Sequence, residues 1–127
     1  MRAVNPSFHI RVIDRPIERA ELARLLGQPF PDMVKFVVDL ERRVVALGGE
    51  LHADGEAVLI EQGSRQDALW GGNYYPGAGE AECIEYTSMI NIRPSAGNRS
   101  IGVESPDLRR RIHDLVVALV GKGEPLP

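Results

Sequence analysis

The N-terminal part of the chain alternates between apolar and polar residues along the run 8–13. Such alternation predicts a strand with one buried face. After Pro16, the leucines within 22–26 fall on one side of a helix, and Gly27 follows them. A proline near the first turn and a glycine after the last turn are typical of a short amphipathic helix. The chain is therefore predicted to begin with a strand and a helix.

Residues 34–47 fit two periodicities, because their apolar positions suit a strand and also a helical stripe. Their high content of valine favours strands, since β-branched side chains pack well on a pleated surface. We therefore predict two antiparallel strands, at 34–40 and 43–47, that turn at residues 41–42. The pair of glycines that follows ends the second strand.

The next two segments are predicted as a helix at 51–62 and a strand at 69–75. Apolar residues recur at helical spacing in the first segment, and Gly63 follows it. The second segment is aromatic and carries Gly71 and Gly72 in its interior. Glycines inside a strand indicate a bulge or the close approach of another backbone.

The run 83–92 is predicted as a long strand, because apolar side chains alternate there with polar ones. Pro94 cannot extend a central strand, since it has no N–H to donate. The chain is therefore expected to leave the sheet at Pro94 and to continue as a polar loop at 95–100.

The last predicted helix starts at Ser105 and Pro106, which have the residue types of an N-cap and a first helical position. An apolar stripe continues to Gly121, and residues 122–127 are expected to form a loose tail. The sequence thus predicts an α+β fold, a single small domain over residues 1–127. It would contain a mainly antiparallel sheet of four to five strands packed by about three helices.

The composition narrows the class of protein. A length of 127 residues fits one domain, and a formal net charge of −3 gives no general attraction to nucleic acid. The single cysteine cannot form an internal disulfide, and no apolar run is long enough for a membrane span or a signal peptide. We therefore expect a cytoplasmic protein without membrane contact. The sequence contains no glycine-rich motif of the kind that binds nucleotide phosphates, and it indicates no other cofactor, so the cofactor is unknown.

Planar hydrogen-bonding side chains gather around the predicted polar loop, namely Asn91, Arg93, Asn98 and Arg99. Guanidinium and amide groups can hold a carboxylate or phosphate through paired hydrogen bonds, so this composition is typical of an anion site. The alternative is structural: the arginines pair with acidic residues and the asparagines satisfy the loop backbone.

Two more polar residues join this candidate site if neighbouring strands pair. Pairing of the predicted strands at 69–75 and 83–92 places Asn73 on the same face as Glu85 and Arg93. The predicted ligand site then contains Asn73 and Glu85 together with the four residues of the loop.

A second candidate site lies at the start of the predicted helix 51–62, where Glu50, His52, Asp54 and Glu56 alternate with other residues. Residues four apart share a helix face, so Glu50 lies beside Asp54 and His52 beside Glu56. Such pairs can supply a base, His52, with Asp54 and Glu56 as its candidate orienting carboxylates. Glu50, His52 and Asp54 are likewise a candidate metal site, although only one histidine is present. The alternative is that the carboxylates only stabilise the helix N-terminus through its dipole.

Several short motifs, spread over nearly the whole chain, carry a family resemblance. They read GGELHAD at 48–54, GSRQ at 63–66, LWGGNYYP at 69–76 and INIRPSAGNRS at 90–100. In this order they resemble an uncharacterised prokaryotic family described only as a domain of unknown function. The resemblance implies a free-standing small protein and supplies no activity, cofactor or partner. Gly72 stands where the strand of that family carries a bulkier aliphatic residue.

Three functional hypotheses follow from the sequence. The first is a binding protein for a small anionic ligand, held by the residues around Arg93. The second is a hydrolase or a metal-assisted phosphoester enzyme with His52 as its base. The third is a homodimeric interaction protein that uses an exposed sheet edge and no small ligand.

Overall fold

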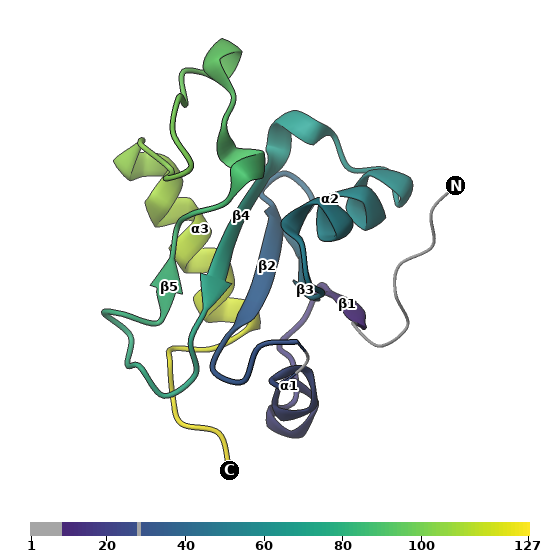
Figure 1. The fold of residues 1–127 in the computed structure, drawn as a ribbon, viewed down its shortest axis with the longest axis vertical. Coiled ribbons are helices and arrows are strands. Elements are labelled where there is room, and N and C mark those ends of the chain that lie inside the picture. Colours follow the sequence, from purple (N-terminus) through teal and green to yellow (C-terminus); the bar gives the residue numbers. More distant parts are fainter. Residues whose placement is uncertain (1–8, 28) are drawn as a thin grey trace.

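The computed structural model describes residues 9–27 and 29–127. One five-stranded sheet runs through it in the order β1-β3-β2-β4-β5, and all neighbouring strands are antiparallel (Figure 1). The predicted small α+β fold is confirmed. The strands are β1 (Ile10–Ile13), β2 (Val34–Asp39), β3 (Val44–Gly48), β4 (Leu69–Tyr74) and β5 (Ile84–Glu85), and the α-helices are α1 (Arg19–Leu25), α2 (His52–Glu61) and α3 (Pro106–Leu119). Short 3-10 helices occur at η1 (Gln66–Ala68), η2 (Met89–Asn91) and η3 (Pro94–Ala96).

The helices divide between the two faces of the sheet (Figure 1). Leu22 of α1 and Ile112 of α3 belong to one buried cluster together with Phe36 of β2. Leu59 of α2 belongs to a smaller cluster with Val37, the next residue of β2. Successive residues of a strand point to opposite faces, so positions 36 and 37 enter different clusters. We call these two sides of the sheet the α3 face and the α2 face.

Most elements lie where the sequence predicted them. The valine-rich segment forms β2 and β3, which pair with each other in antiparallel register. At the start of α3, Ser105 Oγ accepts a hydrogen bond of 3.2 Å from the Leu108 N–H, and Pro106 is the first helical residue. The strand predicted at 8–13 corresponds to β1, and its residue 8 lies outside the described residues.

The prediction of a long strand at 83–92 is wrong. β5 contains only Ile84 and Glu85, and the chain then turns into η2. Two side chains explain this change. Ser88 Oγ accepts the Ile90 N–H and caps η2, and the Asn91 side chain bonds to both the N–H and the carbonyl of Gly71 on β4. A side-chain amide therefore occupies the edge of β4 where a strand backbone was expected, and Pro94 starts η3 instead of ending a strand.

The two glycines inside β4 confirm the predicted close approach. A Cβ atom on Gly72 would lie 2.4 Å from Phe36 Cζ and 2.5 Å from the Glu85 carbonyl oxygen. A Cβ atom on Gly71 would lie 2.8 Å from the Ser88 Cβ. The Phe36 ring thus fills the space that a side chain at position 72 would occupy.

The C-terminal segment, where we expected a loose tail, contacts the end of β4 and the loop that follows it. The Gly123 N–H donates to the Tyr74 hydroxyl at 2.8 Å, and the Gly77 N–H donates to the Gly123 carbonyl at 3.0 Å. In the part of the chain that the structure describes, no helix combines the length and the apolar character that crossing a membrane requires.

Candidate functional site

The two asparagines of the polar loop bond to the backbone around them. Asn91 is fully buried, and its Nδ2 group donates to the Gly71 and Ile101 carbonyls, at 3.0 Å each. Asn98 Nδ2 donates to three carbonyls, one of them that of Asn91, and Asn98 Oδ1 accepts the Glu104 N–H at 2.8 Å. Both amides are saturated by these bonds. The structural alternative therefore accounts for these two residues.

The two arginines of the loop are far from equivalent. Arg93 is largely buried: its guanidinium donates to the Leu69 carbonyl, lies 4.7 Å from the centre of the Trp70 ring, and has Glu56 at 3.9 Å. Burial lowers the pKa of Arg93, and the negative charge of Glu56 opposes that shift. Arg99 is exposed, and its backbone N–H donates to the Glu104 carboxylate at 2.8 Å. The loop residues thus do not converge on one open anion site.

The side chains at the start of α2 point to separate partners. His52 Nε2 lies 2.7 Å from the Gly72 carbonyl oxygen, and a carbonyl can only accept, so Nε2 carries the proton. Glu56 faces Arg93 instead of His52. Among residues 9–27 and 29–127, no group of three His, Cys, Asp or Glu side chains is placed to hold a metal ion, so Glu50, His52 and Asp54 do not form one.

His52 is neutral at physiological pH. Its side chain is 9% exposed, and burial lowers its pKa to about 4. The hydrogen bond to the Gly72 carbonyl and the nearby Asn73 side chain raise this pKa, and the positive charge of Lys35 lowers it further. The ring stands against Gly71, where an added Cβ would lie 3.2 Å from its Cδ2 atom. His52 therefore connects α2 to the centre of β4 and lies close to Lys35.

This burial predicts an acid-sensitive stability. The folded state holds the pKa of His52 near 4, below the value of about 6.5 in an unfolded chain, so the unfolded state binds more protons between these values. Stability is therefore lost as the pH falls through this window. Between about pH 7 and pH 4.5, the protonation of His52 should lower the free energy of unfolding by about 2 kcal/mol. Urea unfolding of the natural protein and of His52→Gln should differ by this amount in their pH dependence; parallel curves would contradict the assignment.

Three polar side chains form a row across the α2 face of the sheet. Lys35 on β2 is opposite Asn73 on β4, and Asn73 is opposite Glu85 on β5. Directly opposite residues in antiparallel strands have side chains on the same face. Asn73 Nδ2 donates to Glu85 Oε1 at 2.7 Å, and the Tyr75 hydroxyl donates to the same oxygen at 3.1 Å. We call Lys35, Asn73 and Glu85 the Lys35 row.

Two polar groups of the Lys35 row have unused hydrogen-bonding capacity. Asn73 is 7% exposed, and its buried Oδ1 atom has no hydrogen-bond donor among the described residues, although its side chain lies close enough to the His52 ring to affect the pKa of His52. The Lys35 ammonium lies 5.2 Å from the centre of the Phe30 ring, and within the described residues no carboxylate lies within 4.0 Å of it. Burial lowers the pKa of Lys35, although the charge of Glu85 raises it. Among the described residues, the row thus contains a buried acceptor without a donor and, next to it, a half-buried cation.

The sequence identified only part of this row. Asn73 and Glu85 were predicted to share a face, and they do, whereas Asn91 and Arg93 leave that face because the strand ends early. Lys35 was missed. The available signal was its position two residues before Val37, on the face that the smaller apolar cluster covers.

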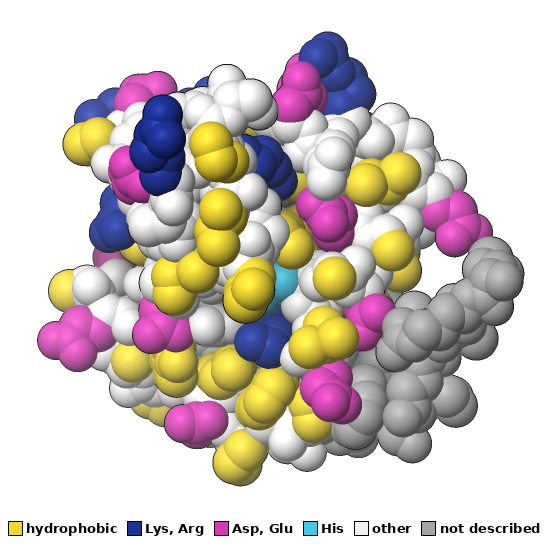
Figure 2. All heavy atoms as spheres, turned by 45° about the horizontal axis from the view of Figure 1, so that its top comes forward, with side chains coloured by type: hydrophobic (Ala, Val, Ile, Leu, Met, Phe, Trp, Pro, Cys, Tyr) yellow, Lys and Arg dark blue, Asp and Glu magenta, His cyan; other side chains and the backbone are white. Residues whose placement is uncertain are grey.

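Exposed hydrophobic side chains occur on the α2 side of the molecule. Figure 2 shows a histidine set back between hydrophobic side chains, with a Lys or Arg side chain directly beside it. Leu51, immediately before α2, and Met89 in η2 are 53% and 77% exposed. Exposed apolar residues around recessed polar groups are a common arrangement in binding sites.

Comparison with known proteins gives a family and no activity. No curated protein and no solved structure matches the chain. A family model matches residues 11–119, which include every strand of the sheet and the three α-helices apart from the first residue of β1. This family is described as a protein of unknown function, DUF5674. The match covers most of the chain, and the chain therefore belongs to the DUF5674 family.

Proposed function

We propose that the protein binds a small organic anion at the Lys35 row. The observation that carries this proposal is the buried Asn73 Oδ1 atom, which has no donor in the described part of the chain and lies in the same cross-strand row as Lys35. Leaving a buried acceptor without a donor costs about 1–3 kcal/mol, so a partner for it is expected. A ligand that supplies a donor recovers this energy.

The chemistry of the row defines the class of ligand. The ammonium of Lys35 would receive a carboxylate or a phosphate. Asn73 Oδ1 can only accept, so the ligand needs a hydroxyl or amine close to its acidic group. Glu85 uses Oε1 for Asn73 and Tyr75, which leaves Oε2 as a further acceptor for such a donor. A hydroxy acid or an amino acid meets both requirements.

The lowered pKa of Lys35 is consistent with this role. Burial disfavours the charged form of the ammonium, and an anion placed beside it would favour that form again. Ligand binding and protonation of Lys35 are therefore coupled, so the affinity for the anion should decrease as the pH rises. This decrease should begin at a lower pH than it would for an exposed lysine.

Binding should depend on Lys35 and on the donor of the ligand. NMR titrations with glycolate, L-serine, acetate and inorganic phosphate test this expectation. We expect glycolate and L-serine to bind more tightly than acetate, which has no donor for Asn73. Lys35→Met should weaken binding at least about tenfold, because it removes the cation.

The chain offers a matched control, since Lys122 is its other lysine and is exposed. Lys122→Met should leave the affinities unchanged. Equal losses in both variants, or no response of residues 35, 73 and 85 to any of the four compounds, would overturn the proposal.

A further inference from the structure

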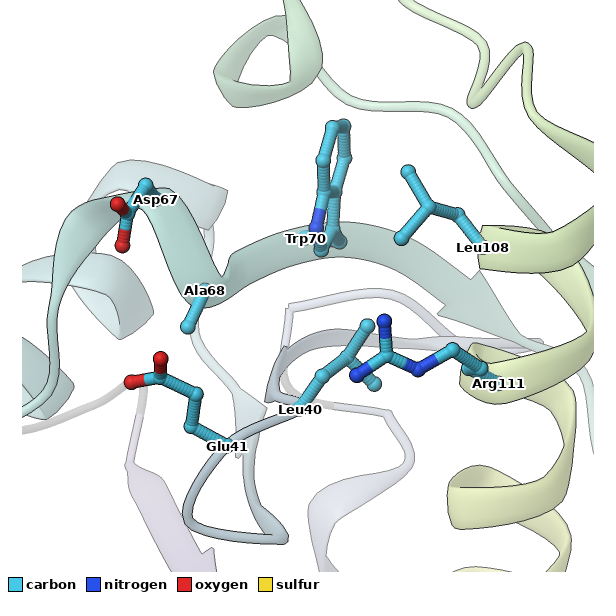
Figure 3. Close-up of a pocket in the computed structure, with 7 residues that line it drawn as sticks. All are labelled: Leu40, Glu41, Asp67, Ala68, Trp70, Leu108 and Arg111. Atoms are coloured by element: carbon cyan, nitrogen blue, oxygen red, sulfur yellow. The ribbon is translucent and has the colours of Figure 1, made fainter. Parts of the chain in front are cut away.

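A second recess lies on the α3 face, away from the Lys35 row. Its volume is about 240 Å³, and it lies between the turn after β2, the 3-10 helix η1, the first part of β4 and α3 (Figure 3). Leu40, Ala68, Trp70 and Leu108 make it partly apolar, while Glu41, Asp67 and Arg111 are its charged residues. We call it the Trp70 pocket.

Two hydrogen-bond donors beside this pocket, on the exposed Arg111 and on Trp70, have no protein acceptor among the described residues. Figure 3 shows the Arg111 guanidinium reaching from α3 toward Leu40 and the nitrogen of the Trp70 indole on the side that faces the pocket. Across the described part of the chain, no carboxylate lies within 4.0 Å of Arg111, in contrast to Arg110, which pairs with Asp107 at 3.0 Å. The Trp70 indole N–H is not one of the buried unpartnered polar atoms of the described residues, so it is reachable from solvent.

The acidic residues at the other end of the pocket already have a cation. Arg65 lies 2.9 Å from the Asp67 carboxylate and 3.6 Å from the Glu41 carboxylate. The pocket therefore has, at the α3 end, a cation without a carboxylate partner among the described residues and an acidic end opposite, where Arg65 balances only one of the two carboxylates. A single negative charge fits beside Arg111, whereas a second charge would lie toward Glu41 and Asp67 and be repelled.

The size of the pocket limits the body of a ligand. A cavity of about 150 Å³ accepts a benzene ring. The Trp70 pocket, at about 240 Å³, has room for one ring and an acidic group and is small for a nucleotide. Its apolar residues provide the wall against which such a ring would pack.

We infer that the Trp70 pocket is a second binding site, for a small apolar monocarboxylate such as an aromatic acid. Arg111 and the Trp70 N–H donate to the carboxylate, and the ring packs against Leu40, Ala68 and Leu108. This site is independent of the Lys35 row, because Trp70 belongs to the cluster on the α3 face.

The test uses the Trp70 indole N–H resonance, which is unique because the chain has one tryptophan. Titration with phenylacetate should shift this resonance saturably. Phenethylamine, which reverses the charge, and inorganic phosphate, which lacks the apolar body, should leave it in place. Arg111→Gln should weaken phenylacetate binding at least about fivefold, since a charged hydrogen bond is lost.

Arg110→Gln is the control, because Arg110 is the neighbour on the same helix and lies outside the pocket. It should leave the affinity within about twofold of the original, a change below the size of one hydrogen bond. Lys35→Met should also have no effect on phenylacetate binding, which separates this inference from the proposed function. An unmoved Trp70 resonance, or equal losses in the Arg110 and Arg111 variants, would refute the second site.

Discussion

Replacing Asn91 by alanine should lower the free energy of unfolding by about 4 kcal/mol. The side chain is fully buried and makes three hydrogen bonds to backbone groups, two of them at Gly71. Its removal leaves those groups without partners in the interior, at about 1–3 kcal/mol each. Because the amide occupies the edge of β4, the loss should also loosen the pairing of β4 with β5. Urea unfolding measures the energy, and hydrogen exchange of the Gly71 amide reports the local opening.

Asn91→Asp is the more stringent variant. The carboxylate keeps the acceptor for the Gly71 N–H, but it faces the Gly71 and Ile101 carbonyls where the amide donated. It should be at least as destabilising as alanine at neutral pH. Ser95→Ala, an exposed change in the same loop, serves as the control and should alter stability by less than about 0.5 kcal/mol. A small effect of both Asn91 variants would contradict the backbone role.

Replacing Gly72 by valine should destabilise the protein by about 3–4 kcal/mol or prevent folding. Its Cβ would lie 2.4 Å from Phe36 Cζ and 2.5 Å from the Glu85 carbonyl oxygen, and the second of these is backbone that cannot move aside cheaply. Gly72→Ala applies the same test with one methyl group and is expected to cost about 2 kcal/mol.

The Phe36 contact can be separated from the backbone contact by a double-mutant cycle. Phe36→Leu removes the ring atoms that meet position 72, so Gly72→Ala should cost at least about 1 kcal/mol less in that background. Strict additivity of the two substitutions would show that the Phe36 ring does not decide the fit. It would also remove our explanation for the glycine at this position.

The sequence predicted those elements whose signals are local. Ser105 and Pro106 are adjacent residues, and together they mark the start of α3. The valines of β2 and β3 indicate strands because rotation about χ1 is restricted in β-branched side chains, which favours the strand conformation. The early end of β5 was unpredictable because it depends on Asn91 bonding to Gly71, twenty residues earlier in the chain. Alternation within 83–92 carries no information about such a partner.

The candidate site was predictable to the extent that its members pair across neighbouring strands. Asn73 and Glu85 were found because β4 and β5 were expected to pair. Lys35 joins them only through the register of β2 with β4, which brings together positions far apart in sequence. For His52, helical spacing suggested a carboxylate partner, whereas the observed partner is the Gly72 carbonyl on β4.

The most direct test of the Lys35 row is the titration of its lysine. The chain has two lysines, so reductive methylation with ¹³C-formaldehyde labels Lys35 and Lys122 as two assignable side-chain signals. We predict that Lys35 titrates at the lower pH, because burial lowers its pKa, and that glycolate or L-serine shifts its signal and raises its pKa while Lys122 stays unchanged. Identical titration of the two lysines, with no response of Lys35 to either compound, would contradict the proposed ligand site.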